Sequence, residues 1–376
     1  MTLYVIRFLT WGAWSILFTF FAVWLATSAP FSAADIAIIA GTLAMTSRAG
    51  ALLFTRRIGK GDFRAVMIST QVLLMATIIW LQWLHLHQIY TLGAWLLGVA
   101  VLGIANSVST LTQLTFIASG NAKDDTVTAF SKENVALNLS AGITPYLSAL
   151  VLAHLPDWYL TFALLYCLPT IALCMRISVT QRRPPACNEP QAPGPNGQSR
   201  TRFLVINFLS FFAFAQFYNV FPFYAEDSLG AEKIGLFFAA SSVLIVTLQI
   251  PLTRLCAQRN RRDMIIAANL ALAVGVYALL FATQKMTAMV AALLLLTLAE
   301  MIFGPLYQSM SIKLFPGRPA FAMAVLTFTW ALAETAATTL GVYMVAQGNA
   351  AALFTLAAMA AALVVAIVWG RRYSTA

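Results

Sequence analysis

Long apolar segments separated by short polar turns fill almost the whole chain. Each is about 20 residues long or longer, which is the length that an α-helix needs to cross the hydrocarbon core of a bilayer. Lipid offers no hydrogen-bond partner to open backbone, and the segments are too long for barrel strands, so we expect helices. The twelve predicted spans are residues 3–26, 34–55, 65–84, 91–117, 129–153, 158–177, 203–225, 233–254, 264–283, 287–314, 320–345 and 349–369.

The composition supports the same class. Of the 376 residues, 60% are hydrophobic and 10% are charged, whereas an average soluble domain is about one quarter charged. A water-soluble globule of this size cannot bury so much apolar surface, and disordered chains are poor in apolar residues. The sequence therefore predicts an all-α polytopic membrane protein.

One long polar stretch, residues 178–202, divides the predicted spans into six and six. It contains five prolines and two glycines and shows no helical pattern, which is typical of a flexible connector. We therefore expect an N-terminal six-helix bundle over residues 1–177, a cytoplasmic linker over 178–202 and a C-terminal six-helix bundle over 203–376. A six-plus-six pseudo-repeat is typical of secondary transporters that alternate around a central site.

Lysine and arginine residues predict the orientation. The net charge is +10, and most of the cations lie in short runs between spans rather than on one folded face, so nucleic acid is not an expected partner. Placing both termini in the cytoplasm puts nearly all of these residues in the inner loops. We accordingly expect a multi-pass protein of the inner (plasma) membrane.

Several motifs resemble those of the major facilitator superfamily, and the resemblance covers nearly the whole chain. LQIPLTRL (248–255) is similar to a Gln-x-Pro-Leu-x-Arg pattern, and LAEMIFGPLYQ (298–308) is similar to a tenth-span Glu followed by Pro. FTWALAE (328–334) resembles the eleventh span, and ALNLSAGITPYLSAL (136–150) resembles a weakened fifth-span antiporter motif. The resemblance implies two pseudo-symmetric bundles with alternating access, and is nearest to twelve-span proton-coupled drug or metabolite exporters.

Two positions depart from the family pattern. The loop after the second span normally contains Asp-Arg-x-Gly-Arg, but residues 56–60 read RRIGK, so an arginine replaces the acid. The buried arginine that relatives carry in the fourth span would fall on Val99, four residues before Gly103. The first departure bears on how the inner gate is latched, and the second removes a residue that lies near the proton path in relatives.

Three acids inside the predicted spans are candidates for proton coupling, because an ionisable group in a bilayer costs roughly 2.5–3.5 kcal/mol. Glu300 is either a proton carrier or a structural acid bonded to a neighbouring helix. Glu334 lies among small residues and is a candidate to carry the proton, bind a cationic substrate or pair with an arginine. Glu133 opens the fifth span, where a local salt bridge or gate contact is the alternative to a proton site.

Two arginines also lie inside predicted spans. Arg48 is a candidate to hold an anionic substrate or to pair with Glu334 of the facing half, and its alternatives are snorkelling to the inner surface or a static ion pair. Arg7 is close to the chain start, so we expect it to snorkel.

Uncharged polar and aromatic residues at helical spacing predict the lining of a substrate cavity. Amides beside amphipathic rings suit a ligand with flat apolar parts and several hydrogen-bonding groups, although each ring alone is also typical of ordinary packing. The candidate substrate-binding residues, besides Arg48, are Asn106, Thr110, Gln113, Asn138, Gln216, Asn219, Tyr307, Trp11 and Trp14.

The sequence lacks the motifs of other classes. There is no GxxxxGK[ST], GxSxG or HExxH pattern, so we expect no catalytic residues, metal or cofactor. His85, His87 and His154 fall at outer ends of spans, where a pH-sensitive rim is an alternative to a plain structural role. We expect a monomeric transporter in the lipid bilayer that uses protons to export a small amphipathic molecule such as a drug, siderophore or metabolite. The alternatives are proton-coupled uptake of an organic anion and a non-transporting membrane enzyme or scaffold.

Overall fold

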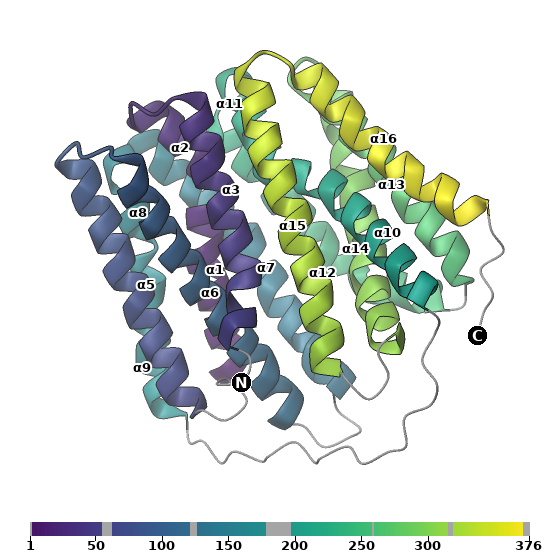
Figure 1. The fold of residues 1–376 in the computed structure, drawn as a ribbon, viewed down its shortest axis with the longest axis horizontal. Coiled ribbons are helices and arrows are strands. Elements are labelled where there is room, and N and C mark those ends of the chain that lie inside the picture. Colours follow the sequence, from purple (N-terminus) through teal and green to yellow (C-terminus); the bar gives the residue numbers. More distant parts are fainter. Residues whose placement is uncertain are drawn as a thin grey trace. The chain divides into compact units, whose positions relative to one another are not determined.

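The computed structural model describes residues 2–54, 62–120, 126–177, 197–257, 259–314 and 319–370, and its regular elements there are all helical. Figure 1 shows them in sequence colours. In the first half they are α1 (Thr2–Thr19), α2 (Phe21–Ser28), α3 (Ala33–Ala49), η1 (Gly50–Phe54), α5 (Phe63–Leu86), α6 (Leu92–Gly120), α7 (Thr126–His154), η2 (Pro156–Trp158), α8 (Tyr159–Phe162) and α9 (Leu164–Arg176). In the second half they are α10 (Gly197–Ala215), η3 (Gln216–Val220), α11 (Phe221–Leu229), α12 (Ala231–Ala257), α13 (Arg261–Ala282), α14 (Met286–Leu314), α15 (Pro319–Ala346) and α16 (Ala350–Trp369).

The expected all-helical membrane fold is confirmed. Within the described residues, nine helices are long and apolar enough to cross a membrane, and the bent pair α1–α2 makes ten. The two remaining predicted spans, 34–55 and 320–345, correspond to α3 with η1 and to α15. Each apolar segment therefore forms a helix where the hydropathy predicts one.

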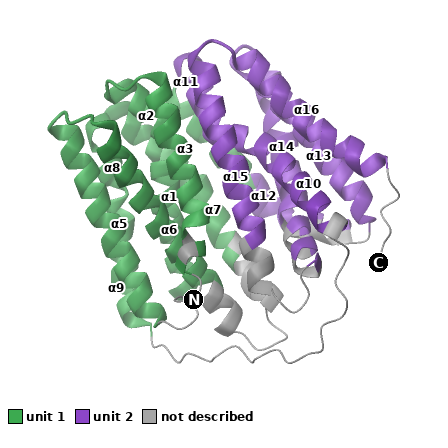
Figure 2. Ribbon diagram, in the orientation of Figure 1, with its two compact units in different colours: residues 1–186, 230–243 green, residues 187–229, 244–376 purple. Residues whose placement is uncertain are grey.

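The chain divides into two compact units, which Figure 2 colours separately. Unit 1 consists of residues 1–186 and 230–243, and unit 2 consists of residues 187–229 and 244–376. The first half of α12 thus belongs to unit 1, whereas the sequence-based boundaries place all of that helix in the C-terminal bundle. Those boundaries remain a prediction.

The same helix pairing occurs inside each unit. In unit 1, α1 packs on α7 and α9, and α5 packs on α6 and α9. In unit 2, α10 packs on α15 and α16, and α13 packs on α14 and α16. Numbered by span within each half, these are in both cases the pairs one–five, one–six, three–four and three–six. This internal repeat is the structural counterpart of the six-plus-six pattern in the sequence.

The first span of each half is broken near its middle, in two different ways. In unit 1, α1 and α2 meet at Phe20 with a bend of 44°. In unit 2, the corresponding span contains the π-helical turn η3, in which the Phe221 amide donates to the carbonyl of Gln216, five residues earlier. Pro222 lies two residues after this turn; it lacks an N–H and its ring crowds the carbonyl four residues before it, which favours the wider turn at this point.

Close helix crossings depend on small residues. A Cβ on Gly142 in α7 would lie 2.6 Å from the Cβ of Ser242, and one on Gly235 would lie 2.9 Å from the Cα of Tyr146. The two glycines therefore allow α7 and the first half of α12 to touch along their backbones. Gly142 belongs to the fifth-span motif, so this packing gives a physical reason for the part of that motif that the chain retains.

Candidate functional site

Unit 1 contains an ion pair buried between α1 and α7. The guanidinium Nε of Arg7 donates to the Glu133 carboxylate over 2.5 Å, and the two residues are 3% and 7% exposed. The guanidinium also lies 5.6 Å from the centroid of the Trp11 ring, and its Nη1 is 3.5 Å from the Thr110 hydroxyl. The expectation that Arg7 snorkels to the surface is therefore wrong.

The reason for this error lies in the helix geometry. Arg7, Trp11 and Trp14 recur at spacings of four and three residues, so all three share the inward face of α1. Trp14 is buried and stacks on Phe18 with ring centroids 5.0 Å apart. Although Arg7 is near the start of the chain, it thus lies in the interior of the helix bundle, because the face of α1 that it shares with Trp14 is packed there.

A row of polar hydrogen bonds continues from this pair across unit 1. The Thr10 hydroxyl donates to Gln113 Oε1 over 3.1 Å, and Gln113 Nε2 donates to the Ser109 hydroxyl over 3.1 Å. Gln71 of α5 donates to the same Ser109 oxygen over 3.2 Å. Its own Oε1 is buried without a partner in the described part of the chain. The predicted polar stripe of the fourth span is thus the middle of a network that connects α1, α5 and α6.

The other polar candidates of unit 1 lie on three different helices. Asn106 in α6 and Asn138 in α7 are both buried. Arg48 is half-buried in the last turn of α3, just before the helix tightens into η1. Their assignment to substrate binding stays a prediction.

Unit 2 holds its two membrane acids through neighbouring residues of the π-helical turn. The Tyr218 hydroxyl donates to Glu300 Oε2 of α14 over 3.1 Å. The Asn219 amide donates to Glu334 Oε1 of α15 over 3.2 Å and to the Thr338 hydroxyl over 2.9 Å. Glu334 is 4% exposed. Consecutive side chains of a helical turn point in different directions, and this π-helical turn uses one side chain to bond each acid.

Aromatic rings and amides surround that turn. Phe214 contacts both Tyr218 and Phe303, with ring centroids 5.4 Å and 5.1 Å away. Gln216 is fully buried; its Nε2 donates to the Phe212 carbonyl over 3.4 Å, and its Oε1 has no partner among the described residues. The acids therefore lie in an apolar setting with a few directed polar atoms.

Tyr307 is part of a different polar cluster in unit 2. Its hydroxyl lies 2.9 Å from the Ser210 hydroxyl and accepts a hydrogen bond from Asn269 Nδ2 over 3.1 Å. Ser210 in turn donates to Asn269 Oδ1 over 2.7 Å. These three side chains satisfy one another, so the structure gives Tyr307 a packing role between α10, α13 and α14. Its assignment to substrate binding stays a prediction.

The sequence did not single out Arg7, Thr10, Tyr218 or Thr338 as site residues. The spacing from Arg7 to Trp11 and Trp14 was an available signal. Tyr218 lies in a run of aromatic residues, where nothing local distinguishes a ring that bonds an acid from one that only packs. Among the described residues, no group of three or more His, Cys, Asp or Glu side chains is arranged to hold a metal ion.

Comparison with known proteins agrees with this fold. Residues 203–375 match the model of the Major Facilitator Superfamily. Comparison with curated protein sequences gave no significant match. By sequence, the C-terminal half of the chain is thus similar to the Major Facilitator Superfamily.

Solved structures of transporters share the fold over almost the entire length. A mutant form of the nucleoside transporter NupG has a TM-score of 0.75 at 11% identity, covering 98% of both chains. A D-xylose-proton symporter has a TM-score of 0.74 at 14% identity, covering 98% of this chain and 96% of its own. A peptide transporter POT in complex with sulfate has a TM-score of 0.75 at 14% identity, covering 98% and 93%. At these identities the likeness concerns the fold.

Proposed function

We propose that this protein is a proton-coupled transporter that exports a small amphipathic organic molecule by alternating access. The proposal starts from a multi-pass membrane protein that shares its fold with solved transporters. The observation that carries the proposal is the pair of acids, Glu300 and Glu334, that one π-helical turn holds in unit 2.

The chemistry of that turn supports proton exchange. Tyr218 and Asn219 each offer a donor to a carboxylate oxygen, and neither brings a charge. A neutral donor such as the Tyr218 phenol stabilises the ionised form of Glu300 less than a cation does, so protonation of Glu300 remains accessible when water leaves the site. A carboxylate that is ionised when wet and neutral when dry is suited to move one proton in each transport cycle.

Unit 1 supports a second, different contribution. Arg7 and Glu133 neutralise each other inside the helix bundle, which makes them stable together and costly to separate. We propose that Glu133 takes part in coupling only when this pair opens, which a proton on Glu133 would favour. Thr110 and Trp11, which contact the Arg7 guanidinium, would then continue to hold it in place.

The remaining candidates define the proposed substrate site. Gln113, Gln216 and Asn219 supply directed amides, and the rings of unit 2 supply flat apolar surface, which suits an amphipathic ligand. Asn106, Asn138, Trp11 and Trp14 are proposed to contribute further contacts. Arg48, at the end of α3, is also proposed as a substrate contact.

Uptake of an organic anion is the second candidate, and the buried Arg7 guanidinium is the observation that favours it. A guanidinium binds carboxylate or phosphate groups in a two-pronged fashion, and a substrate anion could replace Glu133 as its partner. The D-xylose-proton symporter named above also carries its substrate together with protons, as its name states.

Metabolite profiling of cells with and without the gene tests the direction. Loss of an exporter raises the internal level of its substrate, and loss of an importer lowers it. The compound identified in this way is then tested in liposomes that contain the purified protein, with and without an imposed pH gradient. Glu334→Gln is the matched variant, because it keeps the size and the hydrogen-bond acceptor of the side chain and removes the proton site.

Flux that follows the pH gradient in the wild type and is lost in Glu334→Gln supports the proposal. Gradient-independent flux contradicts proton coupling. If deletion of the gene lowers the internal level of the compound, the protein is an importer and not an exporter. If the liposomes show no flux of any compound that accumulates, a non-transporting role is favoured.

A further inference from the structure

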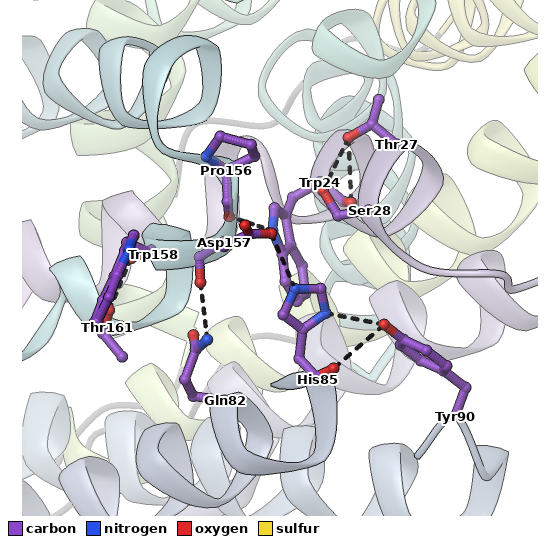
Figure 3. Close-up of polar contacts among 10 residues, drawn as sticks. All are labelled: Trp24, Thr27, Ser28, Gln82, His85, Tyr90, Pro156, Asp157, Trp158 and Thr161. Carbon is purple, nitrogen blue, oxygen red and sulfur yellow. Dashed lines mark hydrogen bonds and ion pairs between the residues drawn. The ribbon is translucent and has the colours of Figure 1, made fainter. Parts of the chain in front are cut away.

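A second cluster of titratable groups lies in unit 1, at the end of α5 opposite to Arg64. Its centre is His85, in the last turn of the helix, where the side chain is 8% exposed. Figure 3 shows His85 between Tyr90, which precedes α6, and Asp157, which belongs to η2. The proposed transport site uses none of these residues.

Both nitrogens of the His85 ring face a partner. Nδ1 lies 3.2 Å from the Tyr90 hydroxyl, and Nε2 lies 3.7 Å from Asp157 Oδ1. The Asp157 side chain is largely exposed, so protons from the adjoining solution reach the pair. A neutral imidazole has one N–H donor, and a protonated imidazole has two and carries a positive charge.

The same cluster holds α2, the outer part of the broken first span. The Trp24 ring of α2 packs against the His85 ring with centroids 4.9 Å apart. Trp24 Nε1 donates to the carbonyl of Pro156, the residue before Asp157, over 2.9 Å. Gln82 of α5 donates to the Asp157 carbonyl over 2.8 Å. The orientation of α2 after its 44° bend is thus coupled to the His85–Asp157 contact.

The backbone after α5 is strained in a way that completes the cluster. Gln88 has a φ of 54°, in the left-handed region that disfavours residues other than glycine. This conformation lets the Ile89 amide donate to the Leu84 carbonyl over 2.8 Å and turns the chain so that Tyr90 returns to His85. Strain of this kind persists where the surrounding contacts determine the conformation.

The groups around His85 differ in whether they can change charge near neutral pH. Burial, and in second place the charge of Asp157, raises the pKa of the Tyr90 phenol, so Tyr90 keeps its proton near neutral pH. The sequence of α2 contains no titratable residue. The Tyr159 hydroxyl of α8 is directed to the Ile16 carbonyl, to which it donates a hydrogen bond. Directly after α5, the exposed ring of His87 lies tilted against Trp83 with ring centroids 4.7 Å apart. Histidine is the side chain that ordinarily changes charge between about pH 5 and pH 8.

We propose that His85 is a proton-binding site separate from the transport site, and that it acts as a pH-operated clasp at this end of unit 1. Protonated His85 donates from Nδ1 to the Tyr90 oxygen and attracts the Asp157 carboxylate with Nε2. The attraction fixes the end of α5 to η2, and Trp24 transmits this restraint to α2. Loss of the proton removes the attraction and leaves α2 freer to move about its bend at Phe20. In the orientation expected from the sequence, this end faces away from the cytoplasm.

Histidine-specific isotope labelling with NMR tests the proton site directly, because the chain has only three histidines. Each signal is assigned by a His→Gln variant. We expect the His85 signal to change on acidification from about pH 8 to about pH 5, and Asp157→Asn to alter this change. His87→Gln is the matched control and leaves the His85 titration unchanged. A His85 signal that is constant over this range, or that is insensitive to Asp157→Asn, overturns the proposal.

A spin label at Ala26, which is exposed on α2, tests the mechanical part. Label mobility should fall on acidification in the wild type and in His87→Gln, and should lose this dependence in both His85→Gln and Asp157→Asn. If His85→Gln does not fold, Asp157→Asn alone decides the result. An unchanged pH response in Asp157→Asn contradicts the clasp. Neither experiment measures transport, so its outcome is independent of the proposed function.

Discussion

The two units differ in the partners that they give to buried charged side chains. Unit 1 pairs Arg7 with Glu133, so a cation and an anion cancel inside the bundle. Unit 2 gives Glu300 and Glu334 a phenol and an amide as donors. An opposite charge favours the ionised form of a carboxylate strongly, and a neutral hydrogen bond favours it less. The proposal that Glu300 exchanges protons fits this difference, because its partner Tyr218 is neutral, whereas Glu133 is held by a cation.

The largest expected effect is the loss of one partner from the pair in unit 1. Arg7→Ala leaves a buried carboxylate without its cation and should lower the free energy of unfolding by about 3–5 kcal/mol. Denaturation of the purified protein in detergent measures this effect.

The double variant Arg7→Ala/Glu133→Ala sharpens the test, because it removes both charges together. It should recover most of the loss, so that the double-mutant cycle gives a clear coupling energy. Additive effects of the two changes would show that the pair does not stabilise unit 1.

The next effect concerns proton exchange in unit 2. Glu334→Gln and Glu300→Gln keep the side-chain size and an acceptor for Asn219 and Tyr218. We expect each to leave the free energy of unfolding within about 1 kcal/mol of the wild type while it removes pH-driven flux. Flux that continues unchanged in Glu334→Gln would exclude that acid from the mechanism.

The π-helical turn offers a more moderate change. Pro222→Ala restores the N–H that an α-helix needs and should favour regular α-helix through residues 216–220. Tyr218 and Asn219 would then rotate away from their acids, at a cost of about 0.5–1.5 kcal/mol for each neutral hydrogen bond lost. We expect slower transport with normal insertion. A wild-type rate would show that the acids do not depend on this turn.

The smallest expected effect is that of Arg48→Ala on stability. Arg48 is half-buried at the end of α3, so its loss should cost less than about 1 kcal/mol, well below the cost of Arg7→Ala. From the sequence alone, Arg48 was the candidate to hold an anionic substrate and Arg7 was expected to snorkel. Equal losses of stability for both variants would remove the contrast between a buried pair and a helix-end cation.

The fold could be predicted from the sequence because bilayer thickness and backbone hydrogen bonding leave a run of about 20 apolar residues few alternatives. Glu300, Glu334 and Gln113 could also be selected, since a charge or a polar stripe in an apolar segment is conspicuous. The hydrogen-bond partners of these residues could not be predicted from the sequence. Whether Tyr218 bonds Glu300 depends on how α10 and α14 are rotated and on a local π-helical turn, which are tertiary features. Arg7 was misassigned because its distance from the chain start was given more weight than its helical face.

Infrared difference spectroscopy of the purified protein tests the contrast between the two units most directly, by following the carbonyl stretch of protonated carboxyl groups as the pH is changed. We expect a pH-dependent band that shrinks in Glu300→Gln and in Glu334→Gln, and that is unchanged in Glu133→Gln as long as the Arg7–Glu133 pair is closed. A band that disappears in Glu133→Gln and persists in both unit 2 variants would contradict it.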